Sequence, residues 1–247
     1  MKRIIFILSL FIYTQSFASE QVFEQGNKQY VNENYSAAIS LYDSILTSGL
    51  ESSELYYNLG NCHYKTNDWA NAIWHYEKSL QINNNNNNNN KKTIHNLKLA
   101  KLKIIDRIEP LPQLFYKKWL VNLTQSLSTQ VWQILTLFGI GLIFILQLIC
   151  QFTSLKSKLI TKIFSAITVI ILLITQTSYH NNFTKKEAII FSETITVNSA
   201  PTSSSTNLFT LHAGSKVEII DSIGDWINIK IVNGNRGWIT ENSIKVL

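Results

Sequence analysis

The sequence predicts a multidomain membrane protein with an all-α repeat domain, a two-helix transmembrane hairpin and an all-β small barrel. Three observations predict this fold class: three uncharged apolar stretches, a helical pattern that occurs twice before the second stretch, and strand-like alternation after the third. The 247 residues are 45% hydrophobic and carry a formal charge of +6. That positive charge would suit a nucleic-acid partner in a cytosolic protein, but the export signal described next excludes this class of partner.

The first apolar stretch, residues 4–12, follows Lys2 and Arg3 and is too short to cross about 30 Å of hydrocarbon as a helix. It is followed by Ser16, Phe17 and Ala18, a small-x-small pattern that suits signal peptidase cleavage after Ala18. The sequence therefore predicts a signal peptide over residues 1–18. An uncleaved signal anchor is the alternative, and whether cleavage occurs stays open.

The second and third apolar stretches predict transmembrane helices over residues 131–150 and 163–180, because their lengths approach the span of a bilayer core. The predicted loop between them, residues 151–162, holds Lys156, Lys158 and Lys162 and no acidic residue. The positive-inside rule then places this loop in the cytoplasm. We expect a two-pass protein of the inner membrane with both soluble domains on the exported, periplasmic side. A buried hairpin of a soluble protein is the alternative.

Residues 19–105 contain a helical pattern in two copies. Placing Gly26 over Gly60 also aligns two tyrosine pairs and two aliphatic pairs: Tyr30 with Tyr64, Tyr42 with Tyr76, Ala38 with Ala72 and Ile39 with Ile73. The pattern resembles the tetratricopeptide repeat, in which two antiparallel helices pack closely only where a small residue faces the partner. We expect Gly26, Gly60 and the two alanines to leave gaps that Tyr42 and Tyr76 fill.

The second copy is followed by an unbroken run of asparagine over residues 83–90. Asparagine has weak helix propensity, so we expect a flexible loop here, with aggregation through asparagine ladders as the alternative to a harmless expansion. Helical spacing returns over residues 91–105 and predicts a capping helix or a truncated third repeat.

The resemblance to tetratricopeptide repeats implies a concave groove that takes extended peptides or partner segments. The positions that match the groove include Asn27 in the first copy and, in the second copy, Tyr57, Asn61, Tyr64 and Lys65. Amide and ammonium groups on one face suit a peptide backbone or a carboxylate. The alternative is that these residues only solvate the groove while the tyrosines pack internally.

Residues 106–130 connect the repeats to the membrane. Pro110 and Pro112 break the helix and restrict the residues before them, which predicts a stiff hinge. Phe115, Trp119 and Leu123 then recur at helical spacing around Lys117 and Lys118. This pattern predicts an amphipathic helix lying on the lipid bilayer.

Residues 187–247 change to strand periodicity. Isoleucines alternate with polar residues and tryptophan over residues 226–231, and Asn233 and Gly234 predict a tight turn into a second strand. Together with further short strands, the stretch resembles the bacterial SH3-like domain, a small barrel that often binds peptides or cell-wall material. Trp226 and Trp238 are expected either to form an aromatic groove or to pack at the core or rim.

The complete order of signal peptide, repeats, proline linker, helical hairpin and SH3-like end resembles the repeat-bearing members of the Bacteroides aerotolerance (Bat) family. The resemblance implies a role in tolerance of oxygen and other stresses, together with membrane partners that carry von Willebrand A domains. It further implies a non-enzymatic scaffold or adaptor, with peptidoglycan binding through the SH3-like end as the alternative.

An enzyme interpretation finds little support in the residues. The 5 histidines form no metal-spaced set with cysteines or carboxylates, and no phosphate-binding glycine loop occurs, so we expect no metal, cofactor or catalytic residue. We expect His75 and Glu77 to lie on a solvated helix face. Cys62 is expected to be a small buried residue, with a redox sensor as the alternative.

Overall fold

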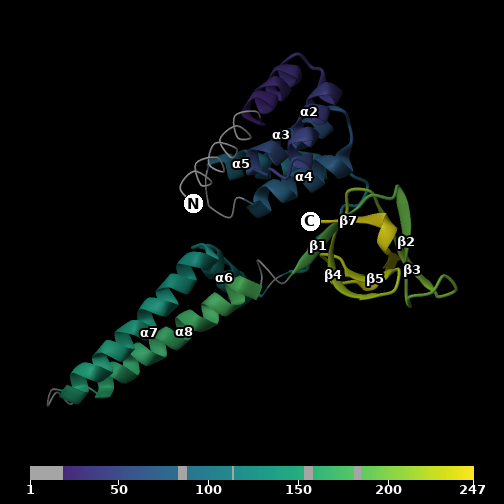
Figure 1. The fold of residues 1–247 in the computed structure, drawn as a ribbon. Coiled ribbons are helices and arrows are strands. Elements are labelled where there is room, and N and C mark those ends of the chain that lie inside the picture. Colours follow the sequence, from purple (N-terminus) through teal and green to yellow (C-terminus); the bar gives the residue numbers. More distant parts are fainter. Residues whose placement is uncertain (1–18, 83–87, 113, 153–157, 181–184) are drawn as a thin grey trace, which may run out of the picture. The chain divides into compact units, whose positions relative to one another are not determined.

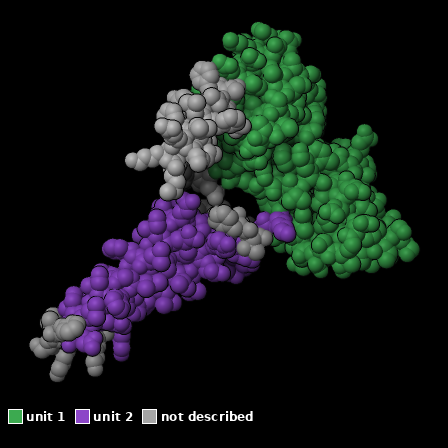
Figure 2. Space-filling model, in the orientation of Figure 1, with its two compact units in different colours: residues 1–109, 187–247 green, residues 110–186 purple. Residues whose placement is uncertain are grey.

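The computed structural model describes residues 19–82, 88–112, 114–152, 158–180 and 185–247. The chain forms two compact units, one of residues 1–109 with 187–247 and one of residues 110–186 (Figure 2). The predicted signal peptide lies outside the described residues. Both soluble domains therefore belong to the first unit, although the second unit separates them in the sequence.

The N-terminal domain consists of antiparallel helices (Figure 1). The first described helix covers residues 19–31 and is followed by α2 (Tyr35–Thr47), α3 (Ser53–Lys65), α4 (Trp69–Ile82) and α5 (Asn88–Lys101). Glu33 and Asn67, which align between the two copies, both adopt positive φ angles of 62° and 61° in the turns inside each helix pair. The Ser52 hydroxyl accepts the Leu55 N–H at 3.0 Å and so caps α3. The repeat seen in the sequence therefore extends to the backbone of the turns.

The predicted packing of glycine against tyrosine is confirmed in both copies. A Cβ atom at Gly60 would lie 2.6 Å from the ring of Tyr76, and one at Gly26 would collide with the ring of Tyr42. The rings of Tyr42 and Tyr76 are buried, and Ala38 and Ala72 are fully buried. Only a glycine lets the first helix of each pair approach the second this closely.

The asparagine run departs from the prediction at its end. Residues 83–87 lie outside the described part, but α5 begins at Asn88, so Asn88, Asn89 and Asn90 are helical and do not belong to a loop. The same helix ends at Lys101, before the predicted end at residue 105. Packing of Leu97 and Ala100 against α4 explains the first difference, since tertiary burial outweighs the weak helix propensity of asparagine.

The second unit contains α6 (Phe115–Gln125), α7 (Thr129–Phe152) and α8 (Lys158–Tyr179). Two of these helices are long and apolar enough to cross a membrane, over Thr129–Gln151 and Leu159–Tyr179. They pair antiparallel through hydroxyl groups, with Thr129 Oγ1 3.0 Å from Ser178 Oγ and Thr136 Oγ1 2.9 Å from Thr175 Oγ1. Such polar contacts hold helices together in hydrocarbon, where apolar side chains gain nothing by leaving lipid.

The two apolar helices α7 and α8 are longer than the stretches predicted from hydropathy. α7 begins at Thr129 and α8 at Lys158, so the predicted loop over 151–162 contributes helical residues at both of its ends. Hydropathy marks the part of a helix that suits lipid, whereas backbone hydrogen bonding continues into its polar flanks.

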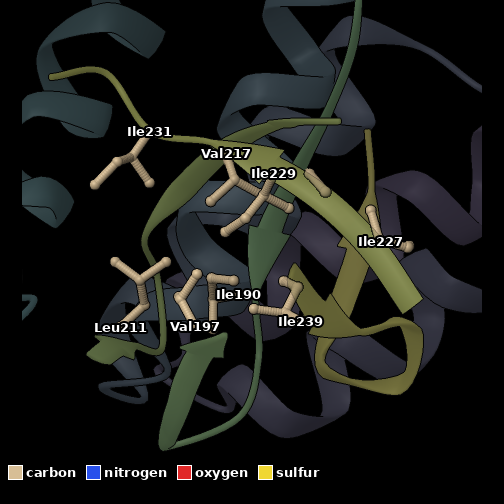
Figure 3. Close-up of a cluster of buried hydrophobic side chains, with 9 residues drawn as sticks. Ile190, Val197, Leu211, Val217, Ile227, Ile229, Ile231 and Ile239 are labelled. Carbon is tan, nitrogen blue, oxygen red and sulfur yellow. The ribbon is translucent and has the colours of Figure 1, made fainter. Parts of the chain in front are cut away.

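The C-terminal domain is one antiparallel sheet that curls around a core (Figures 1 and 3). Its strands are β1 (Lys186–Ile190), β2 (Thr194–Asn198), β3 (Asn207–His212), β4 (Lys216–Ile223), β5 (Trp226–Lys230), β6 (Arg236–Thr240) and β7 (Ile244–Val246), in the order β3-β2-β6-β5-β4-β1-β7. Figure 3 shows Ile227, Ile229 and Ile239 pointing into this core, as the alternation predicts. Gly234 has the positive φ of 90° that the predicted turn requires. The short strand β7 was not predicted.

Candidate partner-binding site

Asn27 and Asn61, the two asparagines predicted to face the groove, each accept hydrogen bonds from neighbouring helices. The Asn27 Oδ1 accepts from the Tyr42 hydroxyl at 2.7 Å and from the Asn58 Nδ2 at 3.0 Å. The Asn61 Oδ1 accepts from the Tyr76 hydroxyl at 2.8 Å and from the Asn96 Nδ2 at 2.8 Å. An asparagine that accepts from one tyrosine and one asparagine thus forms the same hydrogen-bonded bridge twice. The bridge joins the first helical copy to the second copy and the second copy to α5.

This bridge identifies residues that sequence reasoning missed. Asn58 and Asn96 occupy equivalent places on α3 and α5, so α5 packs as the first helix of a third pair. The alignment of Asn27 with Asn61 and of Tyr42 with Tyr76 was a signal that these side chains interact. Burial raises the pKa of both tyrosines, so each hydroxyl stays protonated and donates.

The remaining helical site residues lie along α3. The Tyr57 hydroxyl accepts from the Asn96 Nδ2 at 3.2 Å, and the Tyr57 ring packs 6.1 Å from that of Tyr76. Tyr64 is half-buried and meets the ring of Trp69 edge-on at 5.2 Å. Lys65 is exposed. The oxygen of Asn61 is thus committed to packing, whereas the Lys65 ammonium faces solvent and is available to a partner.

Trp226 and Trp238 lie together on the outer face of the barrel, on β5 and β6. Trp238 is directly opposite Asn228, and Trp226 is opposite Thr240, so the two indoles are diagonal neighbours on one face. Asn198 on β2 pairs with Trp238 from the other side and is almost completely buried. The side chains of Asn228, Trp238 and Asn198 therefore form a row across β5, β6 and β2.

The helical domain and the barrel are joined by charged groups, which corrects the predicted place of Glu77. Glu77 was expected on a solvated face but is buried, where its carboxylate contacts Lys101 Nζ at 2.7 Å and Lys216 Nζ of the barrel at 2.9 Å. Lys216 also contacts Glu187 at 2.6 Å. Burial alone would raise the pKa of Glu77, but the two ammonium groups outweigh it and hold that pKa below its ordinary value.

Two further contacts join the domains. The Asp106 carboxylate, predicted to begin the hinge, accepts the backbone N–H of His212 at 2.7 Å and the Ser215 hydroxyl at 2.5 Å. The Trp74 indole donates to the Val246 carbonyl at 3.0 Å, and the Lys245 ammonium lies 3.6 Å from the centroid of that indole. The first residue of the predicted hinge is therefore fixed to the barrel.

His75 is also buried, contrary to the prediction of a solvated face. Its ring stacks on that of His63 at 5.1 Å, and burial lowers the pKa of His75 to about 2, so the imidazole is neutral. Cys62 is buried as predicted, and burial raises the pKa of its thiol to about 12. That thiol is a packing group and a poor nucleophile at neutral pH. Among the described residues, no set of three histidines, cysteines or carboxylates is arranged to hold a metal ion.

Comparisons with known families match two parts of the chain. The model of the tetratricopeptide repeat matches residues 53–86, which are the second helical copy. The model of the bacterial SH3 domain matches residues 194–245, which contain β2 to β6 and most of β7. A comparison with curated proteins finds no match. The two matched domain types indicate a role in protein interaction or cell-wall binding, and both are typically non-catalytic.

Proposed function

We propose that this protein is a non-enzymatic membrane adaptor whose tetratricopeptide domain binds a segment of a membrane protein partner. The observation that carries the proposal is the joining of a peptide-binding type of helical domain and an SH3-like barrel in one compact unit, on a chain with two helices suited to a membrane. The hairpin would hold this unit at the bilayer surface, and this location favours membrane proteins as partners.

The finer proposal is a role in an aerotolerance or stress-related envelope complex of the BatE type. Its support is the order of domains, since a repeat domain, a hairpin and an SH3-like end follow one another as the resemblance implies. Partners with von Willebrand A domains would then be the proteins recognised. The lysine-rich segment around Lys156, Lys158 and Lys162 supports an orientation in which both soluble domains face the periplasm of the inner membrane.

Co-purification from native membranes tests the adaptor function. The full chain and its Lys65→Glu variant are extracted in mild detergent, and recovered membrane proteins are identified by mass spectrometry. Because Lys65 is exposed, the variant should fold normally and recover partners at least several-fold less well. Equal recovery of every protein by both forms would reject the groove as the binding surface.

Peptidoglycan binding through the barrel is the second candidate function. The neighbouring indoles of Trp226 and Trp238 on the outer face of β5 and β6 favour it, because indoles suit the faces of sugar rings. Sedimentation of the full chain with purified peptidoglycan tests it. Depletion from the supernatant that Trp238→Ala abolishes would support wall binding, whereas no depletion would leave the adaptor as the single proposal.

A further inference from the structure

A cavity of about 740 Å³ opens where the helical domain meets the barrel. Its walls come from the start of α4, the segment that follows α5, and the turn between β1 and β2. Three apolar and three charged side chains define its character: Trp69, Ile104 and Phe191, and Asp68, Lys103 and Glu193. The volume lies within the range of specific ligand sites, and none of the predicted groove residues lines it.

The walls of this cavity are held in place by the contacts between the two domains. Asp106, two residues after Ile104, is bonded to His212 and Ser215 of the barrel. Gly214 has a φ of 92°, and a Cβ atom there would meet the side chain of Ile104 at 2.5 Å. On the barrel side, the Phe191 N–H donates to the Ser243 carbonyl at 2.8 Å. A ligand would therefore find a preformed site, which lowers the entropic cost of binding.

The apolar surface of the cavity is centred on Trp69. Its indole is half-buried, with Tyr64 against one edge and the Lys103 ammonium 5.9 Å from the ring centroid. Ile105, at the rim, is 71% exposed. Tyr64 links this surface to the predicted groove on α3, so a peptide in the groove could continue into the cavity.

The charged groups favour a cation. The Asp68 carboxylate lies 3.2 Å from the His63 Nδ1 and accepts a hydrogen bond from the Asn71 Nδ2 at 2.7 Å. These interactions lower the pKa of Asp68 to about 2. Glu193 is exposed, and within the described ranges it forms no ion pair. The walls thus hold two carboxylates, one from each domain, against the single ammonium of Lys103, which already lies over the Trp69 ring.

We propose that this cavity binds an arginine side chain in an extended segment of the partner protein. The methylene stem would lie along Ile104 and Phe191, and the guanidinium would stack on Trp69 and meet Glu193. An acidic side chain would instead face both carboxylates. The inference rests on the proposed adaptor function, since it names the chemistry of the segment that such a partner presents.

Fluorescence anisotropy tests the proposal with the full chain in detergent micelles. The probe is a fluorescein-labelled peptide of sequence Gly-Ser-Leu-Arg-Leu-Ser-Gly, compared with versions that carry citrulline or glutamate in place of arginine. Citrulline keeps the shape of arginine and removes its charge, so it should bind roughly tenfold more weakly. Equal binding of the citrulline peptide, or stronger binding of the glutamate peptide, would overturn the proposal.

Variants of the chain locate the binding. Glu193→Gln should weaken the arginine peptide by about tenfold, and Lys103→Ala should tighten it, because one competing ammonium is removed. Glu241→Gln, which removes the charge of an exposed carboxylate outside the cavity, is the matched control and should change nothing. Circular dichroism establishes that each variant is folded. Identical affinities of the Glu193→Gln and Glu241→Gln proteins would reject the cavity as the site.

Failure of this inference and failure of the adaptor function give different results. If Lys65→Glu lowers partner recovery while the peptide binds regardless of its arginine, the adaptor stands and the cavity proposal is wrong. If the arginine peptide binds as described but membranes yield no partner, the cavity stands as a basic-peptide site and the adaptor function is wrong.

Discussion

The same kinds of side chain recur at the contact inside both helix pairs of the repeat domain. In both copies a glycine admits a tyrosine ring, and the tyrosine hydroxyl donates to an asparagine on the preceding helix. The ring supplies buried apolar area, while the hydrogen bond fixes the rotation of one helix against the next. The position of each helix therefore depends on residues at the centre of its contact.

Gly60→Ala tests this dependence. In an unpacked helix the change would stabilise by about 0.5–1 kcal/mol, because alanine loses less backbone entropy than glycine. Here the new Cβ atom would lie 2.6 Å from the Tyr76 ring, so we expect a loss of about 1–3 kcal/mol in the free energy of unfolding. Chemical denaturation of the full chain in micelles measures it, with Ser40→Ala on the exposed face of α2 as the control. A stabilised Gly60→Ala protein would contradict the helix contact.

The buried imidazole of His75 predicts a dependence of stability on pH. Its folded pKa of about 2 lies below the ordinary value of 6.5, so between these values the unfolded chain binds a proton that the folded chain does not. The neutral His75 therefore contributes to the free energy of unfolding in full above pH 6.5. This contribution is lost as the pH falls below 6.5, by up to ~1.4 kcal/mol per pH unit.

His75→Phe should therefore reduce the loss of stability between pH 7 and pH 5. Phenylalanine keeps the ring contacts with Tyr56, His63 and Trp74 but cannot take up a proton. Thermal unfolding across this pH range measures the difference from the unmodified chain, and His95→Phe at an exposed position is the control. If the stability of the unmodified and His75→Phe proteins fell in parallel with pH, protonation of His75 would not destabilise the folded state, and the prediction would be wrong.

At the scale of elements, the contact between α4 and the barrel joins domains that lie far apart in the sequence. Glu77 binds Lys216, and Trp74 binds Val246, although α7 and α8 intervene in the sequence. A charge buried with two partners is strongly destabilising once a partner is lost, because desolvation is then uncompensated. The ion pair thus holds the barrel in one position on α4 and α5.

Glu77→Gln should destabilise the soluble unit by about 2 kcal/mol, because Lys101 would lose its counter-charge and Lys216 would keep only Glu187. The matched control is Glu218→Gln. It breaks the partly exposed pair with Lys230 inside the barrel and should cost less than about 1 kcal/mol. Scanning calorimetry in micelles compares the two, and similar losses would show that the Glu77 ion pair does not hold the domains together.

Elements with a strong internal pattern were predictable from the sequence. Alternating isoleucines predicted β5, and the glycine and tyrosine positions predicted the helix contacts, since these signals depend on neighbours within one or two elements. The burial of Glu77 was not predictable, because it depends on Lys216 of the barrel, which follows only after the hairpin. The burial of His75 depends on the rings of Tyr56 and His63 on the neighbouring helix, which the spacing of α4 alone does not reveal. Strand β7 was missed since its three residues are too few to show alternation. Of the site, the sequence indicated the faces of α3 and β5, but not the bonds of Asn61 or the cavity at the domain boundary.

At the scale of the whole molecule, two long apolar helices bracket a lysine-rich segment, and the soluble unit is built from both ends of the chain. If α7 and α8 span a membrane, the helical domain and the barrel can touch only when both lie on the same side of it. The contacts of Glu77 and Asp106 therefore support a two-pass arrangement by an argument independent of the positive-inside rule.

Reporter fusions test this topology. A reporter that is active only after export should work when fused after Lys103 or after Leu247 and should fail when fused after Lys158. The result follows from the charge of the segment around Lys156 and Lys158, which resists translocation. Activity of the Lys158 fusion, or opposite behaviour of the other two, would exclude the two-pass arrangement.

Photo-crosslinking from position 65, in the proposed groove, tests most directly whether the repeat domain binds a membrane protein. A photoreactive amino acid replaces Lys65 in the full chain, and membranes of cells that produce it are irradiated before solubilisation. The control carries the same group in place of Ser44, an exposed residue on the second helix of the first pair. The adaptor function predicts a discrete adduct with a membrane protein from position 65 and none from position 44. Identical adducts from both positions, or adducts with lipid alone, would contradict it.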